Sequence, residues 1–207
     1  MQIVTQKGSA TSPRPTPTGP GVIIAHLNNL QGRWGAGFVL AVDKLSPIPR
    51  KAYKEMAQRH NKNIPLGETQ FCEVEPNLWV ANMVAQNGIR KDADGDGGCL
   101  VEYKALNECL KTVFERAVAL RCNVHIPSGM GSGLAGGSKQ MIHDIITTRA
   151  GSTPIDLLEK QMKFVPQITL WEFDDTTASS YVAKQANSVN PPLVLQPVDI
   201  DTVLDGL

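Results

Sequence analysis

The sequence has little of what would assign it to a class at first sight. Aromatic residues make up 5% of the 207 positions, and 20 basic side chains balance 20 acidic ones. General nucleic-acid binders carry a basic excess, so this balance argues against that class. Every apolar run is too short to cross a membrane. The first 21 residues also lack the apolar stretch of a secretory signal.

Cysteine is scarce as well. The chain has four cysteines, none of them in a CxxC pair: Cys72, Cys99, Cys109 and Cys122. This spacing is typical of free thiols in a reducing compartment and argues against a zinc site or a disulfide framework. We therefore expect a cytoplasmic protein that uses neither a metal ion nor a cofactor.

What the chain does contain is a regular alternation of apolar segments. Apolar residues make up 42% of it and charged residues 19%, as in a soluble globular domain with a sizeable core. Val22–Leu27 is an apolar run rich in β-branched residues, typical of a buried strand. Further strands are predicted at Gln2–Thr5, Gln70–Glu75, Leu78–Val84, Asn123–Pro127 and Ile168–Phe173, and helices at Phe38–Leu45, Pro49–His60, Tyr103–Leu120 and Lys139–Thr148. This alternation predicts an α/β fold with a mixed or mainly parallel sheet.

The end of the chain differs in character. From Asp174 onward the sequence has few residues to bury and contains a Pro-Pro break at Pro191. We therefore expect one domain over residues 1–173 and a flexible tail over residues 174–207. The tail is a candidate tether to a protein partner, and its closing VDIDTVLDGL segment suits a short docking helix.

The loop after Val22–Leu27 is the first candidate binding element. In open α/β sheets, ligands bind beyond the carboxyl ends of the strands. Asn28 and Asn29 stand there, with amides that both donate and accept hydrogen bonds. Nearby glycines allow a ligand to approach the backbone, and a helix that begins near Ala36 offers free amides to an anion. The same residues also suit a plain strand-to-helix turn with structural asparagines.

Ser128–Gly137 is the second candidate element. Half of its ten residues are glycine, which suits a diphosphate cradle made of main-chain amides. Gly131–Gly136 also matches the dinucleotide pattern GxGxxG. That pattern belongs to the first strand-to-helix turn of a two-part fold, and too little chain follows here. A Rossmann domain is therefore the weaker interpretation. If the fold brings this loop next to the loop after Val22–Leu27, the two would place main-chain amides on two walls of a cleft.

Three separated segments in this order, HLNNLQGRWGAGFVLAV, VANMVAQNGI and HIPSGMGSGLAGG, resemble the macrodomain family. The likeness runs from about Met1 to Phe173 and is greatest to small members that process ADP-ribose 1''-phosphate. It implies a three-layer α/β/α sandwich around a mixed, mostly parallel six-stranded sheet. It also implies a cleft that holds ADP-ribose, and a bacterial or phage origin fits it.

The resemblance implies roles for residues of both loops. Asn28 and Asn29 would face the distal ribose, and Gly131–Leu134 would hold the diphosphate through main-chain amides. His26 matches a histidine that is a catalytic candidate in the phosphatase branch, and Asn28 is the second catalytic candidate. The full set of expected ligand-binding residues is Ser9, Ala10, Asn28, Asn29, Trp34, Gly35, Ala36, Gly37, Phe38, Gly131, Ser132, Gly133, Leu134 and Ala135.

Five positions depart from the family pattern. Ser9 stands where many members have an aspartate that reads the adenine amino group, so adenine selection should weaken. Ser128 replaces a common arginine, and Lys139 displaces a common tryptophan. The de-ADP-ribosylating branches use a lysine at the place held here by Ala85 or Gln86, and an aspartate at that of Ala135. A lysine-centred glycohydrolase mechanism therefore does not fit this sequence.

Several of these features also have a plainer interpretation. A histidine at the end of a buried strand, such as His26, often packs in the core with its hydrogen bonds satisfied. Trp34 either covers the bound ribose or fastens its loop to the core. Asp92–Gly97 resembles the start of an EF-hand loop, but the glutamate needed at the twelfth position is absent. We expect a solvated acidic loop there, and structural roles for His125 and His143.

These observations give two hypotheses of function. The first is an ADP-ribose 1''-phosphate phosphatase, in which His26 activates a water and main-chain amides stabilise charge on the phosphoryl oxygens. The second is a binding module without chemistry, which reads ADP-ribose on proteins or sequesters an NAD-derived nucleotide. His26 beside the two loops favours the first, and the missing lysine and aspartate favour the second. Neither hypothesis involves a membrane or general nucleic-acid binding.

Overall fold

The computed structural model describes residues 1–89, 98–158 and 164–173. The acidic loop Asp92–Gly97 and the tail over residues 174–207 lie outside the described residues, as do the expectations made for them. The strands are β1 (Gln2–Lys7), β2 (Gly21–Asn29), β3 (Thr69–Glu75), β4 (Leu78–Gln86), β5 (Cys122–Pro127) and β6 (Gln167–Glu172). The helices are α1 (Val39–Leu45), α2 (Ile48–Arg59), α3 (Tyr103–Leu120) and α4 (Lys139–Leu158).

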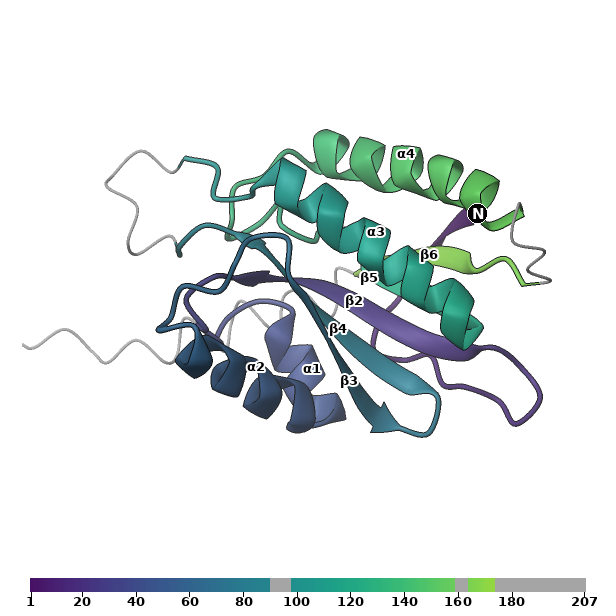
Figure 1. The fold of residues 1–207 in the computed structure, drawn as a ribbon, viewed down its shortest axis with the longest axis horizontal. Helices are drawn as coiled ribbons and strands as arrows, with labels where there is room; N and C mark the ends of the chain where they lie inside the picture. Colours follow the sequence, from purple (N-terminus) through teal and green to yellow (C-terminus); the bar gives the residue numbers. More distant parts are fainter. Residues whose placement is uncertain (90–97, 159–163, 174–207) are drawn as a thin grey trace, which may run out of the picture. The chain divides into compact units, whose positions relative to one another are not determined.

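A six-stranded sheet with the order β1-β6-β5-β2-β4-β3 runs through the middle of the fold (Figure 1). Every neighbouring pair is parallel except β3 and β4, which a short turn at Asn77 joins. Helices α3 and α4 cover one face of the sheet, and α1 and α2 cover the other (Figure 1). The three-layer α/β/α sandwich with a mixed, mostly parallel sheet is therefore confirmed.

Apolar side chains fill the two spaces between the sheet and its helices. β2 lies near the centre of the sheet with buried residues on both faces, which explains its continuous apolar sequence. α3 packs its predicted apolar face against the sheet, where Leu106, Leu110 and Val113 are fully buried. The layer under α1 and α2 contains the aromatic rings of Trp34 and Tyr53. Among the described helices, none is long and apolar enough to span a membrane.

α4 is longer than the sequence predicts. We expected it to end at Thr148, whereas it continues past Pro154 to Leu158. Pro154 has no amide hydrogen to donate to the carbonyl of Ala150. The amino group of Met1 donates to that carbonyl instead, at 3.0 Å. This hydrogen bond joins segments that are far apart in the chain.

β2 is also longer than predicted. Asn28 and Asn29 pair with Val84 and Gln86 of β4, with a register shift between the two asparagines. They are therefore the last residues of a strand, although we expected them in a loop. Because side chains alternate along a strand, His26 and Asn28 lie on the same face of the sheet, the face covered by α1 and α2.

Candidate functional site

The two glycine-rich loops lie next to each other at one edge of the sheet. The first, residues 30–38, follows β2, and the second, residues 128–138, follows β5. β2 and β5 are parallel neighbours, so both carboxyl ends reach the same edge. A Cβ atom added to Gly37 of the first loop would lie 3.6 Å from Cδ1 of Leu134 in the second. Residues 26–38 and 128–138 together are called the candidate site below.

The first loop offers a run of main-chain donors. Within the described part of the chain, the amides of Gly35, Ala36 and Gly37 donate no hydrogen bond. All three residues are exposed, and Gly37 has a φ of 76°, which favours glycine. Consecutive unpaired amides on exposed residues suit a phosphate or another anion.

The second loop is tightly wound by its glycines. The amide of Gly137 donates to the carbonyl of Gly131 at 2.9 Å. Gly131 has a φ of 73°, and a Cβ atom there would lie 3.2 Å from three neighbouring side chains. Only glycine fits this position without displacing its neighbours. Gly133 is exposed, and its amide has no acceptor among the described residues, so it is available to a ligand.

A short segment before α3 supports the second loop. The amide of Leu100 donates to the carbonyl of Ala135 at 2.8 Å, and the hydroxyl of Tyr103 accepts from the amide of Ser138 at 2.8 Å. Ala135 is only 3% exposed, with its side chain in the core. We expected Ala135 to contact the ligand. Because its side chain is buried in the core, only its main chain could make that contact. Sequence reasoning missed this support because it joins segments about three dozen residues apart.

Several buried polar atoms at the candidate site lack a hydrogen-bond partner. In the described ranges, six side-chain nitrogen or oxygen atoms are buried without a partner, and five belong to residues between His26 and Trp34. They are Nδ1 of His26, both amide atoms of Asn28, Oε1 of Gln31 and Nε1 of Trp34. Each unpaired buried atom costs about 1–3 kcal/mol. Their concentration in one place indicates where a polar ligand would supply the partners.

His26 stands in a line of polar side chains that crosses three strands. Its Nε2 atom lies 2.8 Å from Oδ1 of Asn82, its register partner on β4. Nδ2 of Asn82 donates to Oε1 of Gln70 on β3 and to the carbonyl of Pro49, both at 3.1 Å. Nε2 of Gln70 donates to the carbonyl of Ala52 at 3.1 Å. Sequence reasoning missed Asn82 and Gln70, for which the sole signal was a polar residue inside the apolar run of β4.

Burial keeps the His26 ring neutral. The side chain is 1% exposed, and the rings of Trp34 and Phe38 lie 5.6 Å and 5.8 Å from it between centroids. The loss of hydration lowers the pKa of His26 to about 4. At neutral pH the ring therefore carries one proton, and one of its nitrogens is a hydrogen-bond acceptor.

Asn29 builds the first loop. Its Oδ1 atom accepts from the amides of Gln31 and Arg33 at 3.1 Å and 3.0 Å, and its Nδ2 atom donates to the carbonyl of Arg33 at 2.7 Å. The hydroxyl of Tyr53 donates to the carbonyl of Asn29, and burial raises the pKa of that phenol. The ring of Tyr53 also packs against Trp34, which is 8% exposed and fastens the loop to the core. The expected contacts of Asn29 and Trp34 with a ligand stay predictions.

Ser9 and Ala10 follow the end of β1. The hydroxyl of Ser9 lies 2.8 Å from Oγ1 of Thr11 and accepts from the amide of Thr11 at 3.2 Å. Ala10 is fully buried. The Ser9 hydroxyl is thus engaged within its own turn, and Ala10 has only its main chain to offer a ligand.

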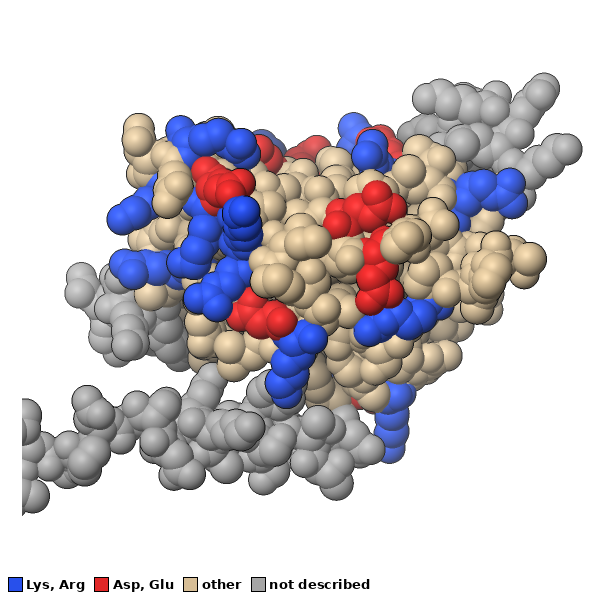
Figure 2. All heavy atoms as spheres, turned by 90° about the horizontal axis from the view of Figure 1, so that it is seen from below, with Lys and Arg blue, Asp and Glu red and all other residues tan. Residues whose placement is uncertain are grey.

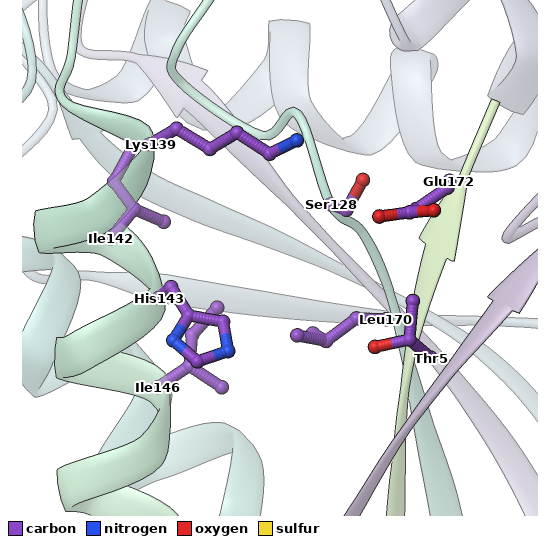
Figure 3. Close-up of a pocket in the computed structure, with 8 residues that line it drawn as sticks. All are labelled: Thr5, Ser128, Lys139, Ile142, His143, Ile146, Leu170 and Glu172. Carbon is purple, nitrogen blue, oxygen red and sulfur yellow. The ribbon is translucent and has the colours of Figure 1, made fainter.

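A pocket of about 160 Å³ lies between α4 and the ends of β1 and β6, next to the start of the second loop at Ser128 (Figure 3). Lys139 and His143 of α4 point into it from one side, and Ser128 and Glu172 lie opposite (Figure 3). The remaining lining residues are Thr5, Ile142, Ile146 and Leu170. None of the residues expected to bind the ligand lines this pocket, so it is distinct from that set. His143, for which we expected a structural role, lies at its wall.

Basic side chains gather on the face formed by α1 and α2. Figure 2 shows them clustered on the side where Figure 1 places α2. The exposed basic residues of this segment are Lys44, Arg50, Lys51, Lys54, Arg59 and Lys62. The end of α2 packs against the first loop, because a Cβ atom on Gly32 would come within 2.3 Å of Cβ of Ala57. Positive charge therefore lies beside the candidate site, which favours an anionic ligand.

Metal and thiol chemistry find no support at the candidate site. The described residues hold no group of three or more His, Cys, Asp or Glu side chains suited to a metal ion. The four cysteines are free thiols, and burial raises the pKa of Cys72, Cys109 and Cys122 to about 11. What the site offers is main-chain amides, amide side chains and one neutral imidazole.

Neither a protein-family model nor a curated protein matches the chain. Among solved structures, a protein of unknown function from Bacteroides thetaiotaomicron is 33% identical with a TM-score of 0.68, covering 83% of this chain and 98% of that one. A macrodomain protein from Streptomyces coelicolor is also 33% identical, with a TM-score of 0.64 and coverage of 84% and 99%. An Oceanobacillus iheyensis macrodomain solved with ADP is 18% identical, with a TM-score of 0.57 and coverage of 88% and 89%, a likeness of fold.

Proposed function

This chain belongs to the macrodomain family, and we propose that its candidate site binds ADP-ribose or a molecule that carries an ADP-ribosyl group. The observation that carries the proposal is the set of five unpaired buried polar atoms between His26 and Trp34, next to two loops with free amides. A sugar hydroxyl both donates and accepts hydrogen bonds, and a diphosphate accepts many. One ligand with both groups therefore matches both parts of the site. The Oceanobacillus iheyensis macrodomain solved with ADP is consistent with this ligand class.

The two loops divide the ligand between them in this proposal. The amide of Asn28, buried and unpaired, binds hydroxyls of the distal ribose. The free amides of Gly35, Ala36 and Gly37 bind the phosphate next to that ribose. The second loop, through main-chain donors such as Gly133, holds the rest of the diphosphate.

Adenine selection is the weak part of the proposed site. Ser9 stands where many family members have an aspartate, and its hydroxyl is already engaged with Thr11. A neutral hydroxyl accepts a weaker hydrogen bond from an adenine amino group than a carboxylate does. We therefore expect ADP-ribose to bind mainly through its diphosphate and distal ribose.

Isothermal titration with ADP-ribose, with AMP as the comparison ligand, tests this function. ADP-ribose should bind, and AMP should bind much more weakly because it lacks the distal ribose and one phosphate. Equal binding of the two ligands, or no heat with millimolar ADP-ribose, would contradict the assignment.

Hydrolysis of ADP-ribose 1''-phosphate is the second candidate function, favoured by the unpaired Nδ1 atom of His26. In this reaction a water attacks the phosphorus, the bond from phosphorus to the ribose oxygen breaks, and that oxygen leaves as a hydroxyl after taking a proton from solvent. Nδ1 of His26 would accept the proton of the attacking water, although a base with a pKa of about 4 is weak. Loop amides would stabilise charge on the phosphoryl oxygens.

Phosphate release separates this reaction from binding without chemistry. The wild type should release inorganic phosphate from ADP-ribose 1''-phosphate slowly, and His26→Gln should abolish the release. Tight binding with no release would leave a module that reads or sequesters the ligand. The sequence fits that alternative, because Ala85 or Gln86 and Ala135 stand where the de-ADP-ribosylating branches have a lysine and an aspartate.

A further inference from the structure

The orientation of the His26 ring is set by two main-chain carbonyls of α2, those of Pro49 and Ala52. The carbonyl of Ala52 accepts a hydrogen bond at 3.1 Å, so the side-chain atom of Gln70 that faces it is the amide nitrogen. Oε1 of Gln70 therefore faces Asn82 and requires a donor there. That fixes the donor as Nδ2 of Asn82, which also donates to the carbonyl of Pro49 at 3.1 Å.

The same constraint passes on to His26. With Nδ2 of Asn82 turned toward two acceptors, its Oδ1 atom faces Nε2 of His26 at 2.8 Å. Nε2 must then carry the proton of the neutral ring, and Nδ1 must be the bare acceptor. Nδ1 is buried and unpaired, and it lies on the same face of the sheet as Asn28, two residues away.

We propose that Gln70 and Asn82 are positioning residues that hold His26 with Nδ1 as an acceptor, so that a hydroxyl of the distal ribose, not a phosphate oxygen, lies opposite it. A hydroxyl can donate a hydrogen bond to Nδ1. An ionised phosphate oxygen has no hydrogen to donate, so its lone pairs would repel the lone pair of Nδ1. The proposal rests on the proposed function, because it assigns one contact within the ADP-ribose site. It extends the site to two residues that touch no ligand themselves.

Nitrogen-15 NMR of the imidazole rings in the full chain tests the proposal. The spectrum of His26→Gln identifies the signals of His26. In the free protein at neutral pH, Nε2 should carry the proton and Nδ1 should show the shift of an unprotonated acceptor. Addition of ADP-ribose should move the Nδ1 signal upfield as it accepts a hydrogen bond, whereas ADP, which lacks the distal ribose, should leave it in place.

Asn82→Asp tests the role of the relay itself. A carboxylate facing Nε2 stabilises the imidazolium ring, so at about pH 6 His26 should gain a proton on Nδ1 and lose its acceptor. The affinity for ADP-ribose should then fall on the order of tenfold. Asn107→Asp is the matched control, because its carboxylate can keep the bond that Nε of Arg149 makes to Asn107 on α3, and it should leave the affinity unchanged.

The outcomes separate the relay from the proposed function. A proton on Nδ1 of the free wild type, together with ADP-ribose binding, would overturn the relay alone. Binding that leaves the Nδ1 signal in place would overturn the hydroxyl contact. An unchanged Nε2-protonated ring with no ADP-ribose binding at all would overturn the proposed function, and with it the ligand contact. The wild-type spectrum decides these cases even if Asn82→Asp does not fold.

Discussion

Nε2 of His26 lies 2.8 Å from Oδ1 of Asn82, and the two residues are register partners on β2 and β4. A histidine that is buried in a strand for structural reasons has both of its ring nitrogens hydrogen-bonded, and Nε2 of His26 meets this expectation. Nδ1 of the same ring does not meet it, because this buried atom has no hydrogen-bond partner among the described residues. One nitrogen of His26 is therefore held within the sheet, and the other is left without a hydrogen-bond partner at the candidate site.

The stability of the domain should depend on pH through His26. Burial lowers the pKa of His26 to about 4 from 6.5, so the unfolded chain binds a proton more readily than the folded protein between these values. The stabilisation from the neutral ring is full above pH 6.5 and is lost as the pH falls toward 4, on the order of 3 kcal/mol in total. His125, with a pKa also lowered to about 4 by burial, adds to the same slope.

Denaturant unfolding at a series of pH values measures this dependence. His26→Gln should remove part of the slope between pH 6.5 and 4 and leave the part due to His125. A variant whose stability depends on pH as steeply as that of the wild type would contradict the account of the buried ring.

Gly131→Ala should destabilise the second loop. The substitution places a Cβ atom 3.2 Å from three side chains, at a residue with a φ of 73°. Crowding and strain should together cost about 1–3 kcal/mol and lower the Tm and the ligand affinity. Gly133→Ala is the matched control, since nothing lies within 4 Å of its added Cβ atom, and its Tm should be unchanged. Equal Tm values for the two variants would show that the loop is not packed as described.

Asn29→Ala should destabilise the domain. The Asn29 side chain makes three hydrogen bonds to the main chain of Gln31 and Arg33, and their removal leaves buried groups unpaired. We expect a loss of about 1–3 kcal/mol in the free energy of unfolding. Urea unfolding measures it, and an unchanged midpoint would mean that the first loop does not depend on this side chain.

The basic face should speed up ligand association. Lys51→Glu together with Lys54→Glu on α2 should lower the association rate of ADP-ribose, and the difference should shrink as salt is added. Lys111→Glu on α3, on the opposite side of the sheet, is the control and should have little effect. Stopped-flow measurements would contradict this role for α2 if all variants associated at the same rate.

The sequence predicts those parts of the fold that depend on local pattern. The period of Leu106, Leu110 and Val113 predicts α3 to the residue, and the apolar run of β2 predicts a buried central strand. The end of α4 could not be predicted, because the donor that replaces the missing amide of Pro154 comes from Met1.

The candidate site divides in the same way. Its two loops follow from glycine content and from their places after two strands, and the closeness of Gly37 to Leu134 follows from the parallel sheet. The relay through Asn82 and Gln70 depends on the register of three strands and on two main-chain carbonyls. The spacing of residues in the sequence does not determine that register. The pairing of His26 with Asn82 and Gln70 on two other strands therefore could not be predicted from the sequence.

The most direct test of the account is to compare stability and ADP-ribose affinity in Asn28→Leu. Both amide atoms of Asn28 are buried without partners, so leucine, which has a similarly branched but larger side chain, removes an unpaired polar group and adds apolar surface. If this amide is kept for a ligand, the variant should be as stable as the wild type or more so, by up to about 1–2 kcal/mol, and should bind ADP-ribose at least tenfold more weakly. A variant that loses stability but binds ADP-ribose as the wild type does would contradict the assignment of the site.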